Sequence, residues 1–229
     1  MFRVKKRRRG KAVVDPKQRS SLLWYKLIRY VGRLLGRRRI YLIGDTHFDH
    51  GNIIKYAQRP FRNVRDMNKK MRRKWNETVR ARDTVYFLGD YTGPPPRRLG
   101  LYYKKLRRWT GQLKGFKTSI LGNHDRNGGC VKFEKNKLLS IGKYTFLLIH
   151  DPKDAEAIKT VKEKYDWIIH GHVHNNEMNK YPFINGIRKT INVSVELIGY
   201  KPVSLDYLVS LGLDSIKRMD TFDSKPERK

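Results

Sequence analysis

The sequence of 229 residues predicts an α/β sandwich in which helices cover the outside of β-sheets. Short apolar runs typical of buried strands alternate with helix-spaced stretches in the first half of the chain, and pairs of strands follow in the second half. Sheets and helices each bury an apolar side against another layer, so this order of elements favours sheets inside and helices outside. The sequence contains no convincing internal repeat.

Each predicted strand is a short apolar run bounded by glycine or polar residues, and each predicted helix carries apolar residues at helical spacing. The strands are predicted at 39–44, 84–88, 116–121, 137–141, 144–149, 167–169, 189–195 and 203–208. The helices are predicted at 66–81, where Asp66 is the expected N-cap, at 97–109 and at 153–164. Three consecutive prolines predict a rigid loop at 91–96.

Positive charge is the most unusual feature of the composition. Lys and Arg number 52 against 21 Asp and Glu, which gives a net charge of +31. Such a field attracts phosphate polyanions and anionic membranes, so nucleic acid is a plausible partner. Aromatic residues interleave with the cations of the helices at 66–81 and 97–109. They fit core packing, which we favour, or stacking on nucleic acid.

The N-terminal residues differ from the rest of the chain. Residues 1–19 predict a basic arm, and 22–35 predict an amphipathic helix. This helix would dock on the domain or, through residues 20–36, lie on a membrane surface or on nucleic acid, and its periodicity does not separate these alternatives. We therefore predict the arm and helix at 1–38, a main domain at 39–212 and a polar C-terminal tail at 213–229.

Cysteine usage and hydropathy bear on the compartment. Cys130 is the only cysteine, so no disulfide can form within the chain, which favours a reducing compartment. No apolar run is long enough to span a bilayer, and the first residues lack a secretory pattern. We expect a cytoplasmic protein.

Polar clusters follow five of the predicted strands. Ligands of open α/β sheets gather outside the carboxyl ends of strands, so the clusters are expected to converge on one cleft. Side chains two residues apart in an extended segment face the same way, so each D-x-H or H-x-H pair would point at one site. The clusters supply as candidate metal ligands Asp45, His47, Asp90, Asn123, His150, His172 and His174.

Seven candidate ligands are too many for one tetrahedral ion and fit two ions that share a bridging carboxylate. Imidazole, carboxylate and amide donors without thiolate suit Mn²⁺, Fe, Zn, Co or Ni and do not choose among them; Mn²⁺ is the ion we prefer. Two metals about 4 Å apart are a known solution for phosphoryl transfer.

The order of these clusters resembles that of the calcineurin-like metallophosphoesterase superfamily, whose motifs are D-x-H, GD, GNH(D/E), H and GHxH. All five occur here in that order, within about residues 39–200. The stretch 45–61, followed by Trp75-Asn76 and by 83–90, is similar to small stand-alone members of bacteria, archaea and phages. The resemblance implies a four-layer αββα sandwich.

The resemblance also implies a role for each residue. Asp45, His47 and His174 would hold one metal, Asn123, His150 and His172 the other, and Asp90 would bridge them. A metal-bridged hydroxide would attack phosphorus in line. His124 would give a proton or hydrogen bond to the leaving oxygen, and Asp125 would orient His124.

Three further residues near the motifs are candidate substrate contacts. His50 would touch the phosphate or fix its own loop by hydrogen bonds. Arg59 and Arg126 would clamp phosphate oxygens or serve as solvated surface residues. For His170, directly before the GHxH motif, we favour a structural role.

Together these features predict a dinuclear metal-dependent phosphoesterase. Phosphodiesters of nucleotides or nucleic acid are the preferred substrates because of the charge, and phosphomonoesters are the nearest alternative. The alternative from another class is a nucleic-acid- or membrane-binding protein that uses the fold as a platform. The oligomeric state is not predicted.

Overall fold

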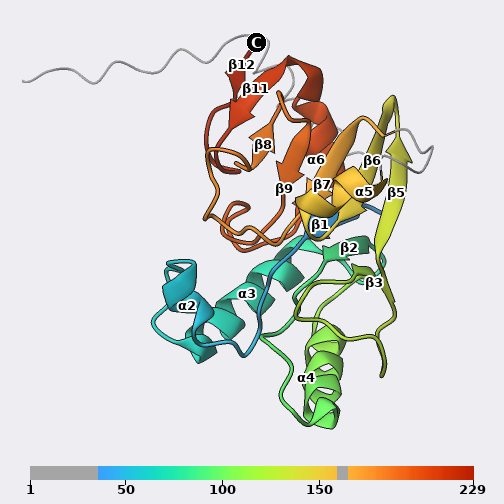
Figure 1. The fold of residues 1–229 in the computed structure, drawn as a ribbon. Coiled ribbons are helices and arrows are strands. Elements are labelled where there is room, and N and C mark those ends of the chain that lie inside the picture. The colour runs from blue at the N-terminus through green and yellow to red at the C-terminus, as the bar shows by residue number, and fades with distance from the viewer. Residues whose placement is uncertain (1–35, 159–164) are drawn as a thin grey trace, which may run out of the picture. The chain divides into compact units, whose positions relative to one another are not determined.

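The computed structural model describes residues 36–158 and 165–229, and the described residues from 38 onward form one compact unit (Figure 1). The basic arm predicted at 1–19 and the helix predicted at 22–35 lie outside the described residues. The helix predicted at 153–164 is described only as a 3₁₀ turn at Pro152–Asp154 followed by α5 (Ala155–Ile158). In the described part of the chain, no helix is both long and apolar enough to cross a membrane.

The first sheet is largely parallel. Within the described ranges its strands are, in order, β10 (Val203–Ser204), β1 (Ile40–Ile43), β2 (Thr84–Leu88), β3 (Phe116–Ile120) and β4 (Phe133–Glu134). β1, β2 and β3 run parallel and confirm the strands predicted at 39–44, 84–88 and 116–121. Parallel neighbours need crossover connections. These crossovers contain α2 (Ile53–Tyr56), α3 (Val64–Thr78) and α4 (Leu99–Gln112).

The second sheet is mixed. Within the described ranges its strands are, in order, β12 (Glu227–Arg228), β11 (Ile216–Met219), β8 (Ile184–Asn185), β9 (Thr190–Asn192), β7 (Trp167–His170), β6 (Tyr144–Ile149) and β5 (Asn136–Ile141). β5 and β6 form the predicted antiparallel pair and turn at Gly142, whose φ of +57° lies in the left-handed region that glycine tolerates.

The C-terminal residues belong to this second sheet. We expected a polar tail at 213–229, but a 3₁₀ turn at Leu213–Ser215 leads into β11, which pairs with β8. Ile216 and Met219 of β11 are buried. Two buried side chains are enough to anchor so short a strand, which is why its composition looks polar.

Two element ends differ from the prediction because of capping. Asn63, not Asp66, is the N-cap of α3, and its side chain accepts a hydrogen bond from Asp66 N at 2.9 Å. The strand predicted at 203–208 ends at Ser204. The Ser204 side chain accepts from Tyr207 N and thereby starts α6 (Leu205–Ser210).

Aromatic side chains of the two long helices belong to the core, as we favoured. Trp75 of α3 is buried, its ring centroid lies 6.1 Å from that of Phe87 on β2, and its Nε1 donates to Lys114 O. Tyr102 and Trp109 of α4 are buried as well. Helices thus pack on a strand of the first sheet, and the α/β class with two sheets is confirmed (Figure 1). The stacking into four layers stays a prediction.

Candidate metal centre

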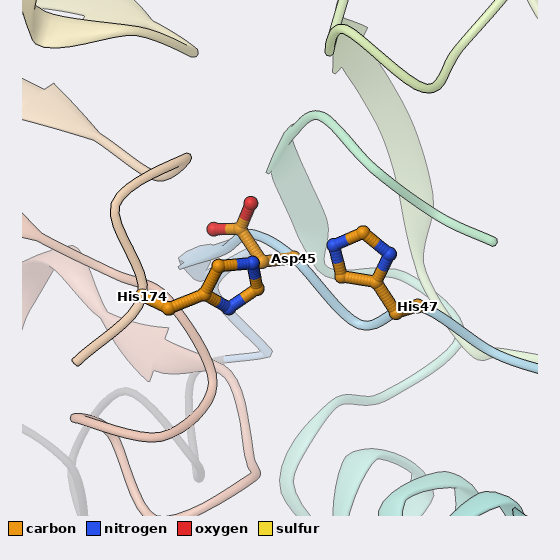
Figure 2. A group of neighbouring side chains, drawn as sticks. All are labelled: Asp45, His47 and His174. Carbon is orange, nitrogen blue, oxygen red and sulfur yellow. The ribbon is translucent and has the colours of Figure 1, made fainter. Parts of the chain in front are cut away.

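The candidate ligands gather where strands of the two sheets end close together. Gly44, directly after β1, donates from its backbone N to the carbonyl of Val193, directly after β9, at 2.9 Å. Figure 2 shows Asp45, His47 and His174 beside one another, with His174 on a different segment from the loop that carries the other two. Each of the three offers a ligand atom within 4.8 Å of the others. This trio could hold a metal ion.

Asp90 lies among several imidazole rings. Its Oδ2 is 3.5 Å from His47 Nε2, 3.6 Å from His150 Nε2 and 3.9 Å from His124 Nε2. Two further clusters that could hold a metal include Asp90, one with His47 and His124 and one with Asp45 and His150. Asp45 and Asp90 each belong to two of the three clusters, and Asp90 is the carboxylate whose one oxygen lies within 3.9 Å of three imidazole rings, as a bridging ligand would.

A third group of candidate ligands surrounds the Asn123 side chain. Asn123 Oδ1 lies 3.0 Å from His150 Nε2 and 3.1 Å from His172 Nδ1. The other nitrogen of His150, Nδ1, is 2.7 Å from the carbonyl of Leu88. Without a metal, Nε2 of His150 can carry a proton and donate it to the Asn123 oxygen. A bound cation would replace that proton and be held by the His150 nitrogen and the Asn123 oxygen together.

The backbone is left-handed at five of the seven candidate ligands. We predicted that Asp45 and His47 point at one site, and both offer a ligand atom to one cluster. The extended conformation from which we argued this was wrong. Non-glycine residues rarely adopt positive φ, and such strained conformations concentrate at functional sites. Positive φ angles occur at Asp45 (57°), His47 (48°), Asp90 (61°), His172 (69°) and His174 (50°).

The electrostatics of the centre fit a divalent cation. Both ring nitrogens of His47 are buried and, among the described residues, have no hydrogen-bond partner. Burial is the largest cause of a pKa of His47 that lies well below its usual value. The ring is therefore neutral and has a lone pair that can bind a metal ion. Burial also raises the pKa of Asp90 to about 7, and the carboxylates of Asp45 and Asp125 act in the same direction. A cation would satisfy the ring and stabilise the ionised carboxylates.

Glu196 is a residue of the centre that our sequence reasoning missed. Its Oε1 lies 3.1 Å from Nδ1 of His174. Because that nitrogen faces the carboxylate, the Glu196 contact fixes how the imidazole ring is turned. The sequence did contain a signal for it, because Glu196 is a charged residue inside the largely apolar run 193–198.

Arg59 supports the loop of the first motif and is not free to clamp a substrate. Its Nη2 donates to the carbonyl of Asp45 at 2.7 Å and its Nη1 to that of Thr46 at 2.8 Å. Its Nε donates to Glu196 Oε1 at 2.8 Å. The side chain is fully buried. The prediction that Arg59 contacts substrate is therefore replaced by a supporting role beneath Asp45 and His174.

Asp125 holds the loop and does not orient His124. Its Oδ2 accepts from Asp90 N at 2.7 Å and from Gly122 N at 3.1 Å, and its Oδ1 accepts from Tyr102 Oη at 3.2 Å. Within the described ranges it makes no hydrogen bond with the His124 ring. The buried carboxylate thereby positions the backbone that carries Asp90. His124 itself is partly exposed beside Asp90, with its Nε2 facing that carboxylate.

The other candidate substrate contacts lie near the centre. His50 is one of the residues that line a cavity of about 480 Å³ above the clustered histidines. Burial, followed by the positive charge of Arg59, lowers the pKa of its ring. Arg126 is exposed and donates to the carbonyls of Asn123 and Asp125 at 3.0 and 2.6 Å. A substrate contact by His50 or Arg126 stays a prediction.

His170 packs in the protein interior. It ends β7, is completely buried and has its ring edge-on to Tyr181, with 5.0 Å between centroids. Burial lowers its pKa to about 4, so the ring is neutral. These contacts agree with the structural role that we favoured.

Comparison with known proteins gives the family. A model of the calcineurin-like phosphoesterase superfamily domain matches residues 39–193, which is more than half of the chain. The chain belongs to this superfamily. The uncharacterized protein MJ1445 of Methanocaldococcus jannaschii is 48% identical to it over 178 residues, or 77% of this chain and 93% of the relative.

Two solved structures resemble this chain to different degrees. The protein of unknown function AQ665 from Aquifex aeolicus is 26% identical and has a TM-score of 0.59, over 76% of this chain and 100% of that one. A Vps29 mutant from Entamoeba histolytica is 19% identical with a TM-score of 0.39, over 69% of this chain and 75% of that one. The second likeness is too distant to bear on function.

Proposed function

We propose that the protein is a phosphoesterase that uses two divalent metal ions. The main support is the position of Asp90, which lies 3.5 Å from His47 and 3.6 Å from His150 and belongs to two candidate metal clusters. Asp45, His47 and His174 would hold one ion, Asn123, His150 and His172 would hold the other, and Asp90 would be shared. The preferred metal is Mn²⁺, since oxygen and imidazole donors without thiolate accept it.

The protein's own side chains then have separate tasks. Bound divalent ions polarise the phosphoryl group and lower the pKa of a coordinated water. His124, whose Nε2 lies 3.9 Å from Asp90 Oδ2 and which lines the cavity, donates a proton or hydrogen bond to the leaving oxygen. Asp125 keeps Asp90 in position through the backbone bond to Asp90 N. Glu196 and Arg59 hold His174 and the Asp45 loop.

The favoured substrates are phosphodiesters of nucleotides or nucleic acid. The net charge of +31 attracts polyanions, and this attraction weakens as salt rises. The same charge is compatible with an anionic membrane surface as a second place of binding. Phosphomonoesters are the alternative substrates.

The test compares bis-p-nitrophenyl phosphate with p-nitrophenyl phosphate while Mn²⁺ is titrated into metal-stripped protein. We expect diester turnover that requires metal and exceeds monoester turnover. A preference for the monoester would move the proposal to phosphomonoesters. Metal binding without turnover of either ester would favour a binding protein that uses the fold as a platform.

A further inference from the structure

The cavity at the candidate metal centre is lined by two kinds of residue. Some are the clustered imidazoles, including His47 and His124. Others, among them Tyr56 from α2 and Pro94 from the loop after β2, are not candidate ligands. The part of a phosphate ester that extends beyond its phosphate would meet this second group, which we call the Tyr56 wall.

Tyr56 is unusually exposed for an aromatic residue. Its side chain is 66% exposed, although it belongs to a helix whose first residue, Ile53, is buried. The described ranges expose four other large apolar side chains, and none of those lines this cavity; they are Leu99, Leu101, Phe116 and Ile187. What distinguishes Tyr56 is therefore its place at the cavity, where a ligand that covered its ring would remove apolar surface from water.

Ring contacts connect Tyr56 to the centre. The His50 ring centroid lies 5.4 Å from that of His47 and 6.4 Å from that of Tyr56. Gly93 packs against His50 so closely that a Cβ at this position would lie 2.7 Å from His50 Cγ. The wall is therefore built by close packing, and Tyr56 stands two ring contacts from the candidate ligands.

Two amide side chains complete the cavity rim. Asn52 and Asn176 both line the cavity and are exposed. Asn52 precedes α2 but makes no side-chain capping bond, and within the described residues neither amide group forms a hydrogen bond. A primary amide offers both a donor and an acceptor, which is the combination that recognises the edge of a base.

We propose that Tyr56 is the stacking platform for a nucleobase attached to the reacting phosphate, with Asn52 and Asn176 facing the base edge. Stacking on an aromatic ring accepts any base, so the subsite selects nucleotides as a class. The inference rests on the proposed phosphoesterase function and narrows its substrates. The base subsite would discriminate nucleotides from sugar phosphates and glycerol phosphates, which have no flat ring to stack on Tyr56.

The kinetic test uses the full chain loaded with Mn²⁺ and two diesters with the same leaving group. One is the p-nitrophenyl ester of thymidine 5′-phosphate, and the other is ethyl p-nitrophenyl phosphate, which has no base. In Tyr56→Ala we expect the ratio of the two KM values to shift about 10-fold against the nucleotide, as the loss of one base stack predicts. Tyr56→Phe keeps the ring and should keep the ratio. Ile187→Ala, another exposed apolar residue, is the matched control and should change neither KM.

A binding measurement tests the subsite without turnover. Calorimetric titration of Mn²⁺-loaded protein with adenosine 5′-monophosphate and with ribose 5-phosphate should give tighter binding of the nucleotide, and Tyr56→Ala should remove the difference. Equal binding of both ligands by the unmodified protein, or an unchanged KM ratio in Tyr56→Ala, would overturn the base subsite. Failure of both diesters to react, with the nucleotide still preferred in binding, would instead count against the phosphoesterase function and leave the base subsite standing.

Discussion

Arg59 and Glu196, 137 residues apart in the chain, form an ion pair of 2.7 Å with side chains that are 0% and 3% exposed. The pair joins the loop that carries Asp45 to the segment that orients His174. Asp45 and His174, two of the three ligands assigned to the first metal alone, therefore depend on one buried charge pair.

Replacing Arg59 should destabilise the fold. Arg59→Met leaves the Glu196 carboxylate buried without its cation and the carbonyls of Asp45 and Thr46 without a donor. Removing one partner of a buried ion pair costs about 3–5 kcal/mol of unfolding free energy. Urea denaturation of metal-free protein measures it.

The matched control is Arg73→Met, which removes an exposed pair with Glu77 in the same chain. We expect little change there because water already solvates both charges. Equal losses in the two variants would contradict a supporting role for Arg59.

Asp90 should be the residue on which metal binding depends most. Asp90→Asn replaces a carboxylate shared by two clusters with a neutral amide, so both ions should bind more weakly. We expect a loss larger than the roughly 10–100-fold that removal of an outer-shell partner costs. Calorimetric titration of Mn²⁺ into stripped protein measures it. Asp206→Asn, on α6, is the control, and wild-type affinity in Asp90→Asn would rule out the bridging assignment.

His124 should affect chemistry more than metal content. His124→Ala removes a proton donor to the leaving oxygen, which costs typically about 10²–10⁴-fold in rate. The loss should be greatest for alkyl leaving groups and small for p-nitrophenol, which departs without a proton. Rates across a leaving-group series and metal analysis check this. If His124→Ala binds less metal than the wild type, His124 is a metal ligand in the cluster with His47 and Asp90 and not a proton donor.

Gly171 should resist substitution because Asp45 lies against it. A Cβ at Gly171 would meet Asp45 Oδ2, so Gly171→Ala must displace a candidate ligand. We expect weaker Mn²⁺ binding, measured by calorimetry. In Gly100→Ala on α4 a Cβ meets nothing within 4 Å, so this control should bind metal normally and gain about 0.5–1 kcal/mol of stability. Unchanged Mn²⁺ affinity in Gly171→Ala would argue that Asp45 is not a metal ligand.

Some features of the site could be predicted from local sequence and others could not. The strands before Asp45 and Asp90 are short apolar runs, so their ends are visible in the sequence. The left-handed backbone at His47 and His174 is not, because nothing in their residue type requires positive φ. The roles of Asp125 and Arg59 were misjudged because their partners are backbone groups, which carry no sequence signature, and side chains far away in the chain.

From the sequence alone the positions of most strands, the α/β class and the donor types that follow each strand could be predicted, because apolar periodicity and residue chemistry act over short stretches. The tertiary structure decided which of these side chains gather around Asp90 and which contacts fix their positions. Arg59 reaches Glu196 across 137 positions, and the Cβ-free surface of Gly171 meets Asp45. Contacts of this kind depend on how distant segments pack, and no local pattern encodes them.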